Sequence, residues 1–183
     1  MNENISNSSA GSGLQPGSSH LSPAPMGTDV KAKIERGDAY AAPEVFDVEI
    51  TVLETVRGDD ALDLIKEQEV SSDLPAEGFE FLLARIKFGY FRRGKGFGNK
   101  PYEFTKGQFS ACSSDGRTQF AALSVSKQPL KPLIGESFNP GDVRDGYIVL
   151  QVPKGEKRPL LIFNREFVEG VYGIWGYIYF QLY

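Results

Sequence analysis

Apolar and polar residues alternate along much of this chain, and the alternation is clearest between residues 75 and 91. From Leu82 to Tyr90 every second residue is apolar, whereas the residues between them are polar or glycine after Leu83. A period of two residues is typical of a strand with one buried face, and a helix over the same residues would have no apolar stripe. The pattern predicts a long central strand whose core-facing residues are Leu82, Ala84, Ile86, Phe88 and Tyr90.

The same alternation predicts further strands on both sides of the central strand. We expect them at residues 30–34, 46–55, 108–113, 117–120, 143–152, 159–163 and 174–182. Turn signals separate them at residues 114–116 (Ser-Asp-Gly) and 139–142 (Asn-Pro-Gly-Asp). Residues 121–136 contain scattered aliphatic residues and are expected to form an irregular connection. About eight short strands separated by turns predict an antiparallel β-sandwich.

One stretch has the periodicity of a helix. In residues 60–68, Ala61, Leu64 and Ile65 form a narrow apolar stripe that can pack on the edge of the sandwich. A helix of this length is too short to be stable alone, so tertiary packing must hold it. The Arg-Gly-Asp sequence at 57–59 matches an adhesion tripeptide. A polar entry to a helix has the same composition, and this is the interpretation that we prefer.

Composition divides the chain into two parts. Residues 1–25 are mainly Asn, Ser, Gly and Pro, and such a segment buries too little apolar surface to offset its ordering entropy. We predict a disordered tether at 1–25, followed by a single domain at 26–183 that is large enough to fold without disulfides. The sequence contains no run of about 18 apolar residues, and its first residues lack the basic stretch and apolar core of a secretory signal.

The inventory of reactive residues narrows the chemistry. The net charge of −4 argues against a nucleic-acid-binding surface. Cys112 is the only cysteine and is expected to be a buried structural thiol, so an internal disulfide and a cysteine zinc site are excluded. His20 is the only histidine and lies in the expected tether, which excludes a histidine triad or metal cluster from the domain. We expect no metal, no cofactor and no catalytic residue, with carboxylate chemistry left open.

The order of five segments resembles the immunoglobulin-like domains of unknown function found in exported lipoproteins and secreted antigens of Gram-positive and related bacteria. These segments are Ser22–Gly27 (SPAPMG), 56–66 (VRGDDALDLIK), 75–83 (PAEGFEFLL), 109–116, which ends in Ser-Asp-Gly, and 140–153 (PGDVRDGYIVLQVP). Together they cover residues 22 to about 153.

The resemblance implies an immunoglobulin-like sandwich and a location at the bacterial envelope. The protein would be lipid-anchored at the extracellular face of the membrane or secreted, from a precursor whose N-terminus precedes this chain. The signal and the lipobox cysteine of that family are not in this sequence. The resemblance carries over no catalytic residue.

A glycine-rich loop after the central strand is the first candidate ligand surface. Five cations lie within fifteen residues: Arg92, Arg93, Lys95, Lys100 and Lys106. They could contact an anionic cell-wall polymer or lipid headgroups. A charged hairpin tip that discourages edge pairing is the simpler interpretation.

The last strand carries the second candidate surface. Trp175, Tyr177 and Tyr179 stand at a period of two and share one face. If exposed, these aromatic side chains could bind a glycan or a protein partner. We prefer the interpretation that they pack within the molecule.

Taken together, these features predict a non-catalytic, envelope-tethered or secreted binding or accessory module. The expected partner is an envelope protein or an anionic cell-wall polymer, with no nucleic-acid partner and with membrane contact only through an N-terminal lipid anchor. One alternative is a carboxylate-dependent, glycan-acting enzyme, which needs two acids about 5–10 Å apart across an aromatic-lined cleft. The other is a secreted, antigen-like domain with a purely structural role.

Overall fold

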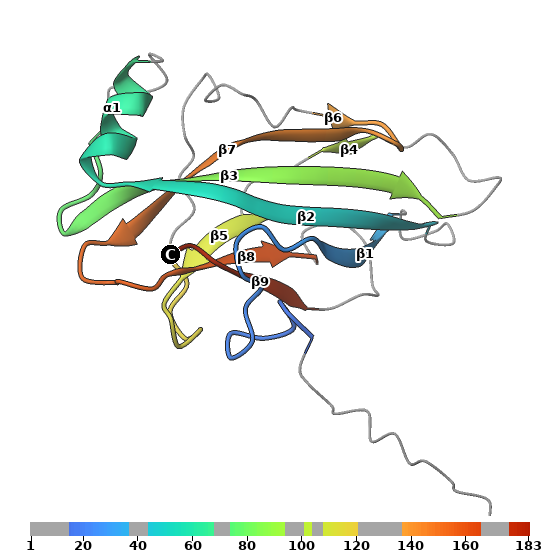
Figure 1. The fold of residues 1–183 in the computed structure, drawn as a ribbon, viewed down its shortest axis with the longest axis horizontal. Helices are drawn as coiled ribbons and strands as arrows, with labels where there is room; N and C mark the ends of the chain where they lie inside the picture. Colours follow the sequence, from blue (N-terminus) through green and yellow to red (C-terminus); the bar gives the residue numbers. More distant parts are fainter. Residues whose placement is uncertain are drawn as a thin grey trace, which may run out of the picture.

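The computed structural model describes residues 15–36, 44–67, 74–93, 101–103, 108–120, 137–165 and 176–183. Within these ranges the chain forms nine strands and one short helix (Figure 1). Their bounds are β1 Val30–Arg36, β2 Glu44–Arg57, α1 Asp59–Glu67, β3 Phe79–Arg92, β4 Tyr102–Glu103, β5 Phe109–Cys112, β6 Ser137–Phe138, β7 Val143–Pro153, β8 Leu160–Asn164 and β9 Tyr177–Gln181.

The strands form two main sheets that pack against each other (Figure 1). The order is β1-β2-β3-β7 in the four-stranded sheet and β5-β8-β9 in the three-stranded sheet, and all neighbours are antiparallel. A third, two-residue ladder joins β4 and β6, which the sequence did not predict. The prediction of a mainly antiparallel β-sandwich with one short helix is confirmed.

The main core lies between the two sheets. The central strand is β3, which pairs with β2 on one side and β7 on the other. Its predicted inward residues are all 0% exposed: Leu82, Ala84, Ile86, Phe88 and Tyr90. Phe88 and Tyr90 both pack on Tyr102, with ring centroids 5.3 Å apart in each case. The predicted register of the central strand is therefore confirmed.

The helix α1 packs on the outer face of the four-stranded sheet. Its buried residues Ala61 and Ile65 contact Phe81 and Leu83, which point away from the main core. At this end of β3 both faces are consequently buried. The helix spans Asp59–Glu67, one residue earlier at each end than predicted, and its apolar stripe packs on the outer face of the sheet and not on the edge of the sandwich as expected.

In the three-stranded sheet, β8 is the central strand and is buried along its whole length. Its residues alternate between the main core and a small apolar cluster on the outer face of the sheet. We call this the outer cluster, and its members are Cys112, Leu160, Ile162 and Tyr179. The prediction that Cys112 is a buried thiol is confirmed, because it is 0% exposed.

Both predicted turns form, because the local chemistry that favours them is satisfied. The Gly116 N–H donates to the Ser113 carbonyl at 2.8 Å, and the Asp142 N–H donates to the Asn139 carbonyl at 2.9 Å. The strand expected at 117–120 is wrong in extent: within the described residues this segment forms one isolated bridge to β5, at Gln119, with the Phe120 N–H donating to the Ala111 carbonyl at 2.7 Å. The connection at 121–136 lies outside the described residues.

Residues 15–25 differ from the predicted tether, because they fold against the domain. The Ala24 N–H donates to the Tyr179 carbonyl at 2.8 Å, and the Gln181 N–H donates to the Ala24 carbonyl at 2.9 Å. The Tyr179 N–H donates to the Gly17 carbonyl at 3.0 Å. Ala24 is completely buried in the main core, so packing and strand-edge bonds offset the ordering entropy of this polar segment. Residues 1–14 lie outside the described residues.

Candidate functional site

The predicted basic surface is described only in part. Arg92 closes β3 and is exposed, and Arg93 follows it, with its Nε 3.7 Å from the Asp47 carboxylate. Arg92 and Arg93 are neighbours at the end of β3, where successive side chains point to opposite faces, and Arg93 is accompanied by an acid. The remaining three cations, Lys95, Lys100 and Lys106, lie outside the described residues.

The tyrosines of β9 face away from the main core, while Ile178 and Phe180 point into it. Tyr177 is 39% exposed, and its ring lies 6.2 Å from that of Tyr179 in an edge-on arrangement. Tyr179 packs in the outer cluster, and burial raises the pKa of its phenol. Tyr179 thus packs within the molecule, whereas Tyr177 is accessible. Trp175 lies outside the described residues.

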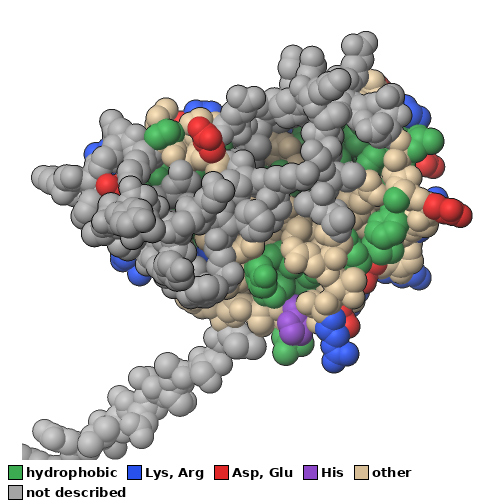
Figure 2. Space-filling view, turned by 180° about the vertical axis from the view of Figure 1, so that it is seen from behind, with side chains coloured by type: hydrophobic (Ala, Val, Ile, Leu, Met, Phe, Trp, Pro, Cys, Tyr) green, Lys and Arg blue, Asp and Glu red, His purple; other side chains and the backbone are tan. Residues whose placement is uncertain are grey.

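His20 and Leu21 extend this surface. The His20 ring lies 6.2 Å from the ring of Tyr179, and its side chain packs so closely on Gly116 that a Cβ there would be 2.7 Å away. Leu21 is 78% exposed. Figure 2 shows the histidine with hydrophobic side chains around it on this face of the molecule. The N-terminal segment therefore contributes to the surface that the sequence assigned to β9 alone.

Arg57 joins three parts of the sandwich at the α1 end. Its Nε donates to Glu80 Oε1 at 2.7 Å, and its Nη2 donates to the carbonyls of Pro153 at 3.2 Å and Glu156 at 2.6 Å. This single guanidinium connects the end of β2 with the start of β3 and the end of β7. The Arg-Gly-Asp sequence at 57–59 is thus the entry to α1, as preferred above.

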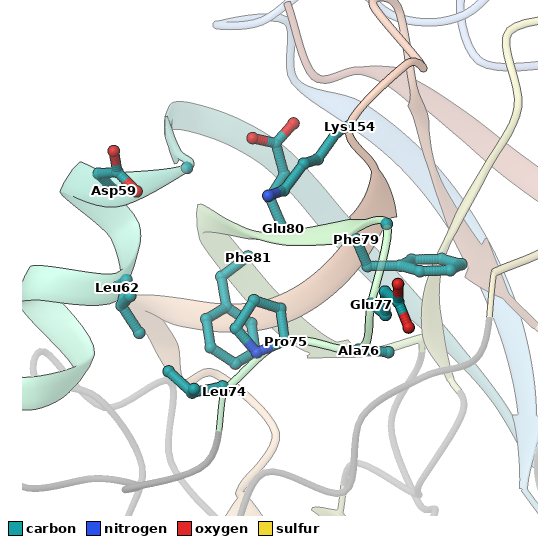
Figure 3. A pocket seen from close by; sticks show the side chains of 12 residues that line it. Asp59, Leu62, Leu74, Pro75, Ala76, Glu77, Phe79, Glu80, Phe81 and Lys154 are labelled. Carbon is teal, nitrogen blue, oxygen red and sulfur yellow. The ribbon is translucent and has the colours of Figure 1, made fainter.

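A hollow of about 540 Å³ opens beside α1, and we call it the α1 hollow (Figure 3). It lies between the start of α1, the segment that leads into β3, the start of β3 and the turn after β7. Leu62, Leu74, Pro75 and Phe81 gather on one side of it in Figure 3. Phe81 forms a buried floor at 4% exposure, whereas Leu74 is 70% exposed.

Hydrogen bonds fix the backbone around the α1 hollow. The Gly58 N–H donates to the Phe81 carbonyl at 2.9 Å, and the Lys154 N–H donates to the Gly78 carbonyl at 3.0 Å. Gly58 and Gly78 have φ angles of 70° and 79°, a region that other residues rarely adopt. The walls of the hollow are therefore positioned before any ligand arrives.

Acidic side chains surround the α1 hollow. Asp59, Glu77 and Glu80 line it together with Lys154. Glu80 is paired with Arg57, at 2.7 Å. Figure 3 shows Asp59 and Glu77 on opposite sides of the hollow, with Asp59 pointing away from the apolar side chains and Glu77 beside the ring of Phe79. Among the residues that the structure describes, no group of three or more His, Cys, Asp and Glu side chains is placed to hold a metal ion.

Beyond α1, the outer face of the four-stranded sheet carries charges of both signs in pairs. The pairs are Arg85–Asp145 at 2.5 Å, Lys87–Asp29 at 2.9 Å and Lys31–Glu49 at 2.8 Å. Hydrogen bonds from Thr51 and Lys87 lower the pKa of the Asp29 carboxyl. Among the residues that the structure describes, opposite charges on this face therefore neutralise each other locally.

The α1 hollow was missed by the sequence analysis. Its lining comes from segments 58–62 and 74–81 and from Lys154, which only the folded chain brings together. The available signal was the apolar pair Leu74-Pro75, which stands three residues before β3 and outside any strand alternation.

Comparison with known proteins finds a structural match of low similarity. No protein-family model and no curated protein matches this sequence. Among solved structures, the chain is similar to YcdA of Bacillus subtilis, described as a "putative lipoprotein", with a TM-score of 0.45 and 11% sequence identity. The match covers 82% of this chain and 38% of the YcdA chain. Within the described ranges, no helix is long and apolar enough to cross a membrane.

Proposed function

We propose that this chain is a non-catalytic binding or accessory domain of the bacterial cell envelope. It is held at the extracellular face of the membrane by a lipid on an N-terminus that precedes the chain, or it is secreted. Its partner is another envelope protein, which it meets without nucleic acid, metal or cofactor. The family resemblance of residues 22–153 supports the location, and the geometry of the domain supports the binding role.

The observation that carries the proposal is the placement of the N-terminal segment relative to the α1 hollow. Gly17 and Ala24 bond to β9, in the three-stranded sheet. The helix α1 packs on the outer face of the other sheet, and Figure 1 shows it on the opposite side of the domain from the N-terminal segment. A domain tethered through its N-terminus therefore presents the α1 hollow away from the membrane.

The lining of the α1 hollow is suited to contact with a partner. Its apolar residues Leu62, Leu74 and Phe81 come from two segments, 58–62 and 74–81, which only the folded chain brings together, and hydrogen bonds fix its backbone. Among the lining residues that the structure describes, there is no Ser, Thr, Cys or His that could serve as a nucleophile or as an imidazole base. The carboxylates of Asp59 and Glu77 stand at the two sides of the hollow, and the third lining carboxylate, that of Glu80, is paired with Arg57. These features favour binding over glycan hydrolysis.

Thiol labelling of intact cells tests the location. Cys112 is 0% exposed and burial raises the pKa of its thiol to about 11, so the natural protein should resist a membrane-impermeant maleimide. Glu77→Cys adds an exposed thiol at the α1 hollow, and Ser18→Cys adds one beside the N-terminal segment. In the cells that naturally make the protein, we expect a small maleimide to label both variants before lysis.

The size of the reagent tests the orientation. A large polyethylene-glycol maleimide should label Glu77→Cys faster than Ser18→Cys in intact cells, and equally fast in the purified protein. Labelling of either variant only after lysis would contradict an extracellular location. If the large reagent labelled both variants at the same rate in intact cells, the α1 hollow would not be held away from a membrane anchor. The secreted form of the protein would then be the form consistent with the result.

A further inference from the structure

Apolar surface stands uncovered at the rim of the α1 hollow. Leu74 is 70% exposed although Leu62 and the buried ring of Phe81 lie beside it. Single exposed leucines are ordinary, but an exposed leucine beside a preformed apolar concavity marks surface that a ligand can remove from water. The hollow therefore offers the same kind of contact that an interface pocket offers to an anchoring side chain.

The size of the α1 hollow limits its occupant. Its volume of about 540 Å³ falls within the roughly 300–1,000 Å³ of ordinary ligand sites. One bulky side chain with its flanking backbone fits such a space. Because hydrogen bonds already hold Gly58, Gly78 and Lys154 in place, binding would require little ordering of the walls.

The charge around the α1 hollow determines which charged residues can flank the side chain that binds in it. Asp59 and Glu77 stand at its rim, and Lys154 is the one cation among the lining residues that the structure describes. The exposed side of α1 adds Asp60, Asp63 and Glu67, against one lysine at 66. Excess negative charge at an exposed rim repels anionic polymers and attracts Lys or Arg.

We propose that the α1 hollow docks a segment of a partner protein in which a bulky apolar side chain stands next to Lys or Arg. The apolar side chain packs against Leu62, Leu74 and Phe81, and the cation lies near Asp59 or Glu77. This inference rests on the proposed binding function and deepens it, because it names the chemistry of the partner.

Nuclear magnetic resonance titration of the purified full chain tests the proposal. The probe is the blocked peptide acetyl-Lys-Lys-Leu-Phe-Lys-Lys-amide, compared with the same peptide carrying Glu for every Lys and with one carrying Ser for Leu and Phe. We expect the first peptide alone to shift the signals of Leu62, Leu74 and Phe81, with a Kd of about 1 mM that weakens as salt rises. No shift at about 5 mM peptide, or equal shifts with the acidic peptide, would overturn the proposal.

Two pairs of variants locate the binding. Leu74→Ser should weaken peptide binding about fivefold, and Val143→Ser should leave it unchanged. Val143 is a matched control, because it is 52% exposed and lies at the other end of β7 from the hollow. Glu77→Gln should weaken binding about threefold, whereas Glu103→Gln, an exposed acid on β4, should have no effect.

The controls also separate competing outcomes. An equal loss in Val143→Ser or Glu103→Gln would place the peptide elsewhere and overturn the proposal. A dimer in analytical ultracentrifugation that Leu74→Ser dissociates would assign the hollow to a second copy of this chain and overturn it as well. Failure of the peptide titration together with positive labelling in intact cells would reject the docking inference alone. Failure of labelling with specific peptide binding would reject the proposed location alone.

Discussion

The outer faces of the two sheets have opposite character. On the four-stranded sheet beyond α1, charged side chains such as Arg85 and Asp145 pair in contact with solvent. On the three-stranded sheet the outer cluster is apolar, and Cys112, Leu160 and Ile162 are only 0%, 2% and 4% exposed. This cluster lies under Tyr179, against which His20 of the N-terminal segment packs. The outer face of the four-stranded sheet carries solvent-exposed ion pairs, whereas the outer cluster of the three-stranded sheet is covered by Tyr179 and the N-terminal segment.

The difference explains which strands the sequence describes well. In the part of β3 that leaves one face to water, apolar and polar residues alternate, and the pattern is visible at once. In β8 both faces are buried, so its sequence is a continuous apolar run that does not show which side chains point into the main core. A segment rich in Ser, Gly and Pro can also belong to the fold when a strand edge accepts its backbone, as β9 does at Ala24.

Replacing a core residue of β3 should have the largest effect. Ile86→Asp places an unpaired carboxylate in the main core, at a position that is 0% exposed, and should cost more than about 5 kcal/mol, enough to unfold the domain. Lys87→Thr removes only an exposed pair with Asp29 and should cost less than about 1 kcal/mol. Urea denaturation followed by circular dichroism measures both. A larger loss in Lys87→Thr would show that the two faces are exchanged.

Removal of the covering segment should have the next largest effect. Deleting residues 1–25 removes Ala24 from the main core and breaks its two bonds to β9 and the bond from Tyr179 to Gly17. At about 1 kcal/mol for each bond, we expect a loss of about 3 kcal/mol in the free energy of unfolding. Deleting residues 1–14 keeps all these contacts and is the control. Equal melting temperatures of the two truncated forms would show that the segment is a simple tether.

The pH dependence of stability reports on the outer cluster. Burial raises the pKa of Cys112 to about 11 from an ordinary value of 9.0, so the folded protein keeps this proton after the unfolded chain has lost it. The free energy of unfolding should therefore fall as pH rises from about 9 to about 11, by about 2 kcal/mol more than in Cys112→Ala. Urea denaturation across this range measures the difference. A constant difference between the two proteins would show that the thiol titrates normally.

Uncovering the outer cluster should have a smaller effect. Tyr179→Ser removes a ring that packs on the cluster and should cost about 1–2 kcal/mol, and it should make Cys112 react faster with iodoacetamide under native conditions. Tyr177→Ser is the control, because Tyr177 is 39% exposed and lies outside the cluster. A rate of Cys112 modification that is the same in both variants would mean that Tyr179 does not cover the thiol.

Breaking an ion pair of the four-stranded sheet should have the smallest effect. Arg85→Met removes the pair with Asp145 at 2.5 Å, and because both side chains are about one-third exposed, the cost should stay below about 1 kcal/mol. The difference from the natural protein should shrink as salt rises, because screening weakens exposed charge pairs. Thermal melts at low and high ionic strength measure it. A decrease of several kcal/mol in the free energy of unfolding that does not depend on salt would contradict the view that the charge pairs on this face are exposed to solvent.

The sequence by itself determined the elements whose signals are local. The alternation along β3, the apolar stripe of α1 and the turns at 113–116 and 139–142 depend on residues only a few positions apart. The direction of side chains in a strand and the positive φ of a turn residue depend on neighbouring residues, so both can be predicted from the sequence. The burial of Cys112 and the face of Ile86 follow from the same patterns.

The tertiary structure alone decided the position of the N-terminal segment, the central place of β8 and the α1 hollow. Arg57 reaches the carbonyl of Glu156, ninety-nine residues away in the sequence, and Ala24 bonds to β9 at the other end of the chain. Such contacts depend on which backbone groups and apolar surfaces remain unsatisfied once the sheets have formed. No local pattern records that requirement, because each partner becomes available only after distant strands have paired.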